Sequence, residues 1–127
     1  MNKADVKVLL VEDDSFLSKM YQTKLAIENF TVIVAGDGQE GLSQALLAMP
    51  DIILLDIILP TMSGWDVLEK LKSQVETKDI PVILLTNLGQ KEDIDRGLKL
   101  GANDYLIKAH FTPAEVVKKI HDVINKK

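Results

Sequence analysis

The sequence predicts an α/β fold, because five short apolar runs alternate with five segments that have the apolar spacing of helices. Strands that alternate with helices pair in parallel and connect through right-handed crossovers. Residues 52–55, Ile-Ile-Leu-Leu, are apolar throughout, as strands covered by helices on both faces require. We therefore expect a flavodoxin-like (βα)5 domain, with a five-stranded parallel sheet in the order 2-1-3-4-5.

The expected strands are the apolar runs at residues 6–11, 30–35, 52–55, 82–85 and 105–107. Helices are expected between them, and the last is the clearest because Thr112 and Pro113 supply an N-cap and a first-turn proline. Segment 91–100 is a weaker helix around Gly97, with Gly101 as its expected stop. The apolar residues that mark the other helices are, in chain order, Phe16, Leu17, Met20, Tyr21 and Leu25; Leu42, Ala45, Leu46 and Met49; Trp65, Leu68, Leu71 and Val75; Val116, Val117, Ile120, Val123 and Ile124.

Length and composition indicate one globular domain over residues 1–127, with no linker and no output domain expected. The net charge of −4 argues against direct nucleic-acid binding, which needs a basic face. The absence of cysteine excludes disulfides, thiolate catalysis and Cys-based zinc sites, and is compatible with a reducing compartment. We see no signal-peptide core and no run of 18 apolar residues, so we expect a cytoplasmic location and no membrane insertion.

Four of the five apolar runs stop beside a residue that can handle a phosphoryl group or a metal ion: Glu12 and Asp13, then Asp56, Thr86 and Lys108. The ends of parallel strands meet at one edge of a sheet, so we expect one acidic pocket there. Two carboxylates about 4 Å apart repel by roughly 4 kcal/mol at an effective dielectric near 20, so the cluster must protonate or recruit a cation. Oxygen-only ligands suit Mg2+, with Mn2+ possible.

Thr86 and Lys108 would add a hydroxyl donor and a fixed positive charge, which can neutralise the oxygens of a transferring phosphoryl group. An aspartate can serve as the covalent nucleophile in such a transfer. The residue types alone leave open which carboxylate attacks and which ones bind metal. Asp14 starts a predicted helix, and we interpret it as the N-cap of that helix.

These features resemble the response-regulator receiver domain, the phosphoacceptor module of two-component signalling, and in particular its single-domain, chemotaxis-regulator-like members. The resemblance spans nearly the whole chain and is carried by residues 8–14, Asp56, Pro60, Gly64, Thr86, residues 101–102 and residues 104–108. It implies that Asp56 is phosphorylated, and that Glu12, Asp13, Asp56 and the backbone carbonyl of Ile58 hold Mg2+. It further implies that Thr86, Lys108 and the backbone of Asn87 bind phosphoryl oxygens, and that Thr86 and Tyr105 form the switch.

The same resemblance implies the partners. A sensor histidine kinase or a histidine phosphotransfer protein would donate the phosphoryl group. A downstream protein of unknown identity would bind the surface of the fourth helix, fifth strand and fifth helix, where lysines 118, 119, 126 and 127 are expected. Such a chain catalyses its own phosphorylation and dephosphorylation but acts primarily as a signalling switch. The sequence leaves open the kinase, the signal, the target, the phosphate lifetime, the oligomeric state and whether the chain is a fragment.

Three residues depart from the usual receiver pattern. Receivers usually carry a proline joined by a cis peptide after the lysine, and Ala109 stands there. A cis bond before a non-proline residue costs about 2.5–4 kcal/mol, so we expect a trans bond and a rerouted loop. Asn87 replaces a residue that is commonly small and would narrow access to the phosphoryl group. Ile58 would slow self-hydrolysis, because it is apolar where water attacks.

Two other functions stay open as alternatives, namely a receiver-like interaction module that is never phosphorylated and a small Mg2+-dependent phosphohydrolase. Residues 36–41, Gly-Asp-Gly-Gln-Glu-Gly, also match the G-x-G-x-x-G dinucleotide motif. The motif follows the expected edge strand, however, whereas a dinucleotide motif follows a strand beside the switch point of the sheet. We interpret Asp37 and Gly38 as a turn and a helix start.

Overall fold

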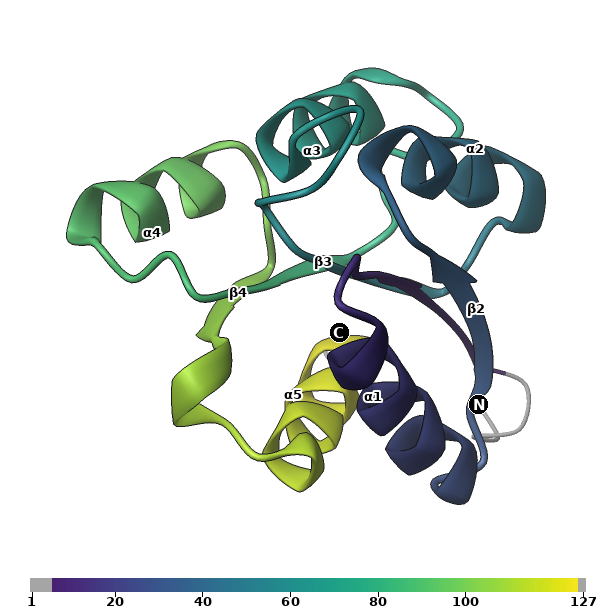
Figure 1. Ribbon diagram of the computed structural model, residues 1–127. Coiled ribbons are helices and arrows are strands. Elements are labelled where there is room, and N and C mark those ends of the chain that lie inside the picture. Colours follow the sequence, from purple (N-terminus) through teal and green to yellow (C-terminus); the bar gives the residue numbers. More distant parts are fainter. Residues whose placement is uncertain (1–5, 126–127) are drawn as a thin grey trace.

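The computed structural model describes residues 6–125. Its core is one parallel sheet of five strands in the order β2-β1-β3-β4-β5, which confirms the predicted fold class and order (Figure 1). The strands are β1 (Lys7–Val11), β2 (Thr31–Ala35), β3 (Ile52–Leu55), β4 (Val82–Thr86) and β5 (Asp104–Ile107). Each lies within about one residue of its predicted run. Lysines 126 and 127, expected on the output surface, lie outside the described residues.

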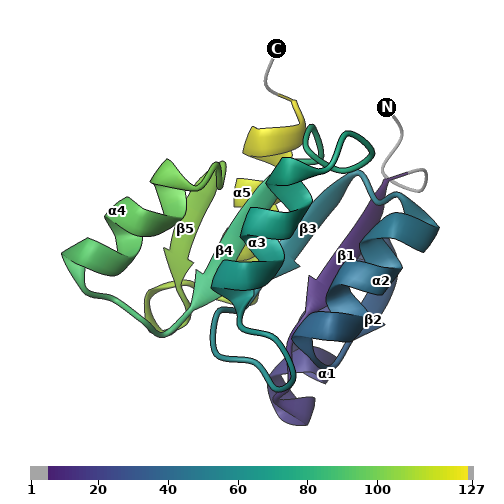
Figure 2. The ribbon, with the colours of Figure 1, turned by 90° about the horizontal axis from the view of Figure 1, so that it is seen from above.

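Within residues 6–125, five α-helices cover the two faces of the sheet, as Figures 1 and 2 show. One face carries α2 (Gly38–Ala48), α3 (Gly64–Ser73) and α4 (Lys91–Lys99), and the other carries α1 (Ser15–Ile27) and α5 (Pro113–Ile124). Successive strand residues point to opposite faces, so each strand feeds two cores. Leu9, Ile53 and Leu84 pack toward α2 and α3, whereas Leu10 and Leu54 pack toward α1 and α5.

The local signals for helix starts are confirmed. The Asp14 carboxylate accepts a hydrogen bond from the Leu17 amide at 3.0 Å and caps α1. Thr112 and Glu115 form a reciprocal capping box at α5, with Pro113 in the first turn. Asp37 caps α2 in the same way as Asp14 caps α1.

The apolar spacing was wrong about Val75, because α3 ends at Ser73 and Val75 is 74% exposed. A turn replaces the predicted last turn of the helix. The Thr77 hydroxyl donates to the Leu71 carbonyl at 2.7 Å, and the ammonium group of Lys72 binds the Ile80 carbonyl at 2.8 Å. The Thr77 hydroxyl thus binds a carbonyl group in the last turn of α3, and the Lys72 side chain fixes the chain that follows. The spacing also placed Phe16, Leu46 and Met49 on apolar helix faces, and all three are exposed.

The chain after β5 follows the predicted departure from the usual receiver pattern. No cis peptide bond occurs among residues 6–125, so the bond between Lys108 and Ala109 is trans, as expected. The chain turns there through a single turn of 3-10 helix, η2 (Lys108–His110). None of the helices in this described range combines the length and the apolar character that a membrane span requires.

Candidate functional site

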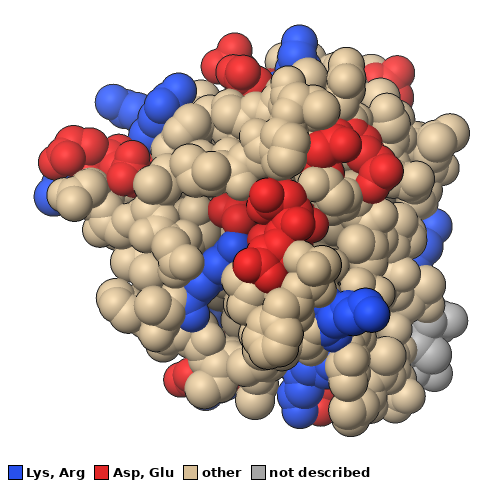
Figure 3. Space-filling model, in the orientation of Figure 1, with Lys and Arg blue, Asp and Glu red and all other residues tan. Residues whose placement is uncertain are grey.

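The carboxyl edge of the sheet holds a pocket of about 410 Å³ that brings the predicted site residues together. Its lining residues are Glu12, Asp13, Asp14, Leu17, Asp56, Ile58, Thr86, Asn87, Leu88 and Lys108. Acidic side chains gather near the middle of this face of the molecule, with basic side chains beside them (Figure 3). Of the predicted site residues, only Tyr105 does not line the pocket.

The pairing of β1 with β3 determines where the two buried carboxylates, Glu12 and Asp56, lie. Val11 and Leu55 are register partners in β1 and β3, and Glu12 and Asp56 follow them directly. The backbone ladder continues one residue further, because the Glu12 amide donates to the Ala35 carbonyl at 3.0 Å and the Asp56 amide donates to the Val11 carbonyl at 3.1 Å. Both carboxylates are therefore carried on hydrogen-bonded backbone at the end of the sheet.

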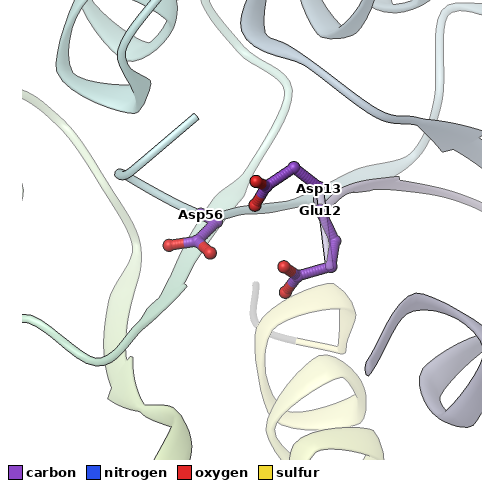
Figure 4. A group of neighbouring side chains, drawn as sticks. All are labelled: Glu12, Asp13 and Asp56. Atoms are coloured by element: carbon purple, nitrogen blue, oxygen red, sulfur yellow. The ribbon is translucent and has the colours of Figure 1, made fainter. Parts of the chain in front are cut away.

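The three carboxylates of Glu12, Asp13 and Asp56 face a common space, with one oxygen from each within 4.8 Å of the others (Figure 4). Glu12 and Asp56 are 3% and 6% exposed, whereas Asp13 is exposed at the rim. The Lys108 ammonium lies 2.6 Å from Glu12 Oε1 and 2.6 Å from Asp56 Oδ2. The Ile57 amide donates to Asp56 Oδ1 at 2.6 Å. The aspartate thus has a hydrogen-bond partner at each oxygen.

Burial and ion pairing act against each other in this cluster. Burial raises the pKa of Glu12 above its ordinary value, although the hydrogen bond from Lys108 opposes the rise. For Lys108, burial acts to lower the pKa, but the hydrogen bonds to Asp56 and Glu12 outweigh it, so the pKa is raised. The lysine is therefore charged at neutral pH.

The donor set fits a divalent cation. Three carboxylates and one ammonium leave two negative charges when all are ionised, and a divalent cation balances that charge. The ligands are all oxygen, the set that Mg2+ and other hard cations prefer. Because Asp13 is exposed, the cation position is open to water and to a phosphate.

A second group of contacts connects the pocket to β5 through the backbone of Leu88. The buried hydroxyl of Thr86 accepts a hydrogen bond from the Leu88 amide at 3.4 Å. The Tyr105 hydroxyl donates to the Leu88 carbonyl at 2.6 Å, and burial raises the pKa of this phenol to about 12. Gly97 of α4 lies against the Tyr105 ring, where an added Cβ would be 2.9 Å from Cδ2. Tyr105 therefore points inward in this structure.

Sequence reasoning predicted Ile58 at the pocket but missed the other two apolar lining residues, Leu17 and Leu88. Leu17 was assigned only to a helix face. Leu88 contributes through its backbone amide and carbonyl, which the side-chain type does not reveal. Its place two residues after Thr86, at the end of a strand, was the one available signal.

A doubly wound domain with a buried aspartate, a lysine and a threonine at its carboxyl edge has the architecture of a phosphoacceptor domain. The family model described as the response regulator receiver domain matches residues 8–121. The chain belongs to this family. Receiver domains interact with histidine kinases and bind Mg2+ at an acidic pocket, and Glu12, Asp13 and Asp56 form such a pocket here.

Relatives and solved structures agree with this assignment. The chain is 39% identical over 122 residues to the cell cycle response regulator CtrA of Brucella ovis, a match that covers 95% of this chain and 51% of that protein. It is 37% identical over 120 residues to "Probable transcriptional regulator ycf27" of Guillardia theta, covering 94% and 46%. The receiver domain of Francisella response regulator 1452 superposes with a TM-score of 0.88 at 30% identity, covering 95% and 98%. The chain spans about half the length of the curated relatives that it matches.

Proposed function

We propose that this chain accepts a phosphoryl group on Asp56 from the phosphohistidine of a sensor histidine kinase or a histidine phosphotransfer protein, in a reaction that requires Mg2+. The observation that carries this proposal is the buried contact of 2.6 Å between Asp56 Oδ2 and the Lys108 ammonium, beside the carboxylates of Glu12 and Asp13. An aspartate that served only as a helix cap or a surface charge would not need a buried cation and two further acids.

In the proposed transfer, a carboxylate oxygen of Asp56 attacks phosphorus and the P–N bond to the donor imidazole breaks. The imidazole nitrogen leaves with the electron pair. Lys108, the Thr86 hydroxyl and the backbone amide of Asn87 then bind the oxygens of the transferred group. Glu12, Asp13, Asp56 and the Ile58 carbonyl would hold Mg2+, which would supply additional positive charge for those oxygens. The exposed Ile58 side chain at the mouth of the pocket supports slow hydrolysis of the product.

The switch that we propose runs through Leu88. In the present structure the Thr86 hydroxyl accepts a hydrogen bond from the Leu88 amide. A phosphoryl group on Asp56 attracts this hydroxyl. Movement of Thr86 shifts the backbone of Leu88, whose carbonyl accepts the hydrogen bond from the Tyr105 hydroxyl. Phosphorylation would thus shift the population of the α4–β5–α5 surface toward the state that a downstream protein binds. A cytoplasmic location of this receiver unit, and the absence of direct nucleic-acid contact by the unit itself, belong to the same proposal.

Intact-protein mass spectrometry after incubation with acetyl phosphate and Mg2+ tests the proposed function. We expect the wild type to gain the mass of one phosphoryl group, and expect the gain to disappear with EDTA. Asp56→Asn is the control and should gain nothing. A wild type that gains no mass would instead support a receiver-like interaction module, and repeated turnover of phosphate monoesters would support a phosphohydrolase.

A further inference from the structure

Residues 36–41, which match a nucleotide-binding motif, contact the loop between β3 and α3 in this structure. The Gly38 amide donates to the Pro60 carbonyl at 3.1 Å, and the Gln39 amide donates to Thr61 Oγ1 at 3.1 Å. The Thr61 hydroxyl in turn donates to Asp37 Oδ1 at 3.0 Å. We call the contact between the Asp37 and Thr61 side chains the latch. It joins the start of α2 to the loop that leads from β3 into α3, and the two segments lie side by side in Figures 1 and 2.

The contact is too close to admit a side chain at Gly38. A Cβ atom at this position would overlap the Met62 carbonyl oxygen. The glycine that suggested a phosphate cradle is therefore used for close packing of two protein segments. The Asp37 carboxylate also accepts the Glu40 amide at 2.8 Å, so one aspartate both caps α2 and holds the loop. The hydrogen bond from the Glu40 amide is the larger cause, and that from the Thr61 hydroxyl the smaller, of a lowered pKa at Asp37.

The loop is held in a conformation that its sequence does not favour. Thr61 has a φ of +65°, which is in the left-handed region that β-branched residues rarely adopt. The Met62 amide donates to the Pro60 carbonyl at 2.7 Å across Thr61, which closes a γ-turn of the strained kind. Such a backbone conformation is strained and persists only where the surrounding structure enforces it. The latch supplies that enforcement at the strained residue itself.

The strained turn sits within the loop that leaves the metal pocket. The loop starts at Asp56, and Ile58 lines the pocket. The loop ends at Gly64, whose amide donates to the Ile57 carbonyl at 2.7 Å and so joins the two ends of the loop. Ile58 thus lies between two fixed points, the Gly64 contact at the base of the loop and the latch at its tip. A backbone carbonyl has no rotamers, so the conformation of its loop alone decides where it points.

We propose that Asp37 and Thr61 are positioning residues for the divalent cation, and that the latch holds the Ile58 carbonyl in place as a ligand. This inference rests on the proposed function, in which that carbonyl binds Mg2+. Neither latch side chain lines the pocket, so each acts only through the loop. The latch also gives residues 36–41 a function that does not involve a nucleotide.

Calorimetric titration of the metal-free protein with MgCl2 tests the proposal without depending on phosphorylation. Thr61→Val removes the hydroxyl but keeps the branched shape, and we expect the Kd for Mg2+ to rise about tenfold, as for other residues that orient metal ligands. Thr61→Ser keeps the hydroxyl and should bind as the wild type does. Thr61→Gly relieves the backbone strain but lacks the hydroxyl, so its affinity for Mg2+ should fall as that of Thr61→Val does. If Thr61→Val fails to fold, Thr61→Gly takes its place in the test.

Thr77→Val is the matched control for a general loss of stability. Thr77 is fully buried and donates to the Leu71 carbonyl at 2.7 Å, at the opposite edge of the sheet. This variant should lower the Tm and leave the Kd for Mg2+ unchanged. Equal Kd values for the wild type, Thr61→Val and Thr61→Gly would overturn the latch and leave the proposed function intact. A wild type that binds no Mg2+ would overturn the metal requirement, and the latch with it.

Discussion

Helices α4 and α5 flank the same strand but are attached to the domain very differently. Helix α5 begins at a capping box and buries Val116, Val117 and Ile120 against the sheet. Helix α4 has no side-chain cap at Gln90, and its one buried residue is Gly97. Of these two helices, α4, which we propose responds to phosphorylation, has the fewer buried apolar residues, and regions with few buried apolar contacts open more easily.

Besides the partly buried Ile94, two further contacts link α4 to its neighbours. Gly97 lies on the Tyr105 ring, and the guanidinium of Arg96 lies 4.3 Å from the centre of the Trp65 ring on α3. A cation–π contact at such an exposed site contributes about 0.5–1 kcal/mol. Under the proposed switch, a change at Leu88 and Tyr105 therefore shifts α4 more readily than α5.

The two helices should differ most in the stability that is lost when an apolar side chain facing the core is shortened to alanine. Ile120→Ala in α5 removes a fully buried side chain and should lower the free energy of unfolding by about 3–4 kcal/mol. Ile94→Ala removes a partly buried side chain of α4 and should cost only about 1 kcal/mol. Urea denaturation of both variants measures the two values. Equal losses would mean that α4 is anchored as firmly as α5.

Removal of the buried lysine tests the fixed part of the site. Lys108→Met leaves Glu12 and Asp56 without their cation and should cost about 3 kcal/mol at pH 7. The pKa of Lys108 is raised in the folded state, so its contribution is complete below its ordinary value of 10.5 and is lost as the pH rises through the higher folded value. The stability gap between wild type and variant should therefore close in strongly alkaline buffer. A gap that is the same at pH 7 and in that buffer would contradict the ion-pair account.

The smallest expected difference concerns the helix caps. Thr112→Ala removes the capping box of α5 and should cost about 1 kcal/mol, whereas Gln90→Ala at α4 should change stability very little, because Gln90 makes no side-chain cap bond. Thermal unfolding measures both. A loss at Gln90 as large as that at Thr112 would show that the start of α4 is held by a contact of this side chain.

The sequence was informative where structure is decided locally or by topology. Asp14 and Thr112 were identified as caps because a cap depends on the next three residues. Glu12 and Asp56 were expected to meet because parallel strands end at one edge, and β1 and β3 are neighbours.

Tertiary contacts account for what the sequence did not reveal. The exposure of Phe16 and the loss of Val75 from α3 depend on which surface the helix meets and on the turn at Thr77. The function of Leu88 resides in backbone atoms, which every residue carries. The latch was not foreseen, because Asp37 and Thr61 are 24 positions apart and nothing in either residue type indicates the other.

Amide hydrogen exchange with and without acetyl phosphate and Mg2+ tests the central claim, that phosphorylation of Asp56 is transmitted to a loosely attached α4. We predict that amide exchange changes in α4 and in the loop around Leu88, between β4 and α4, while the amides of α5 change little. Asp56→Asn should show no change under the same conditions. A phosphorylated wild type in which α5 changes and α4 does not would contradict the account.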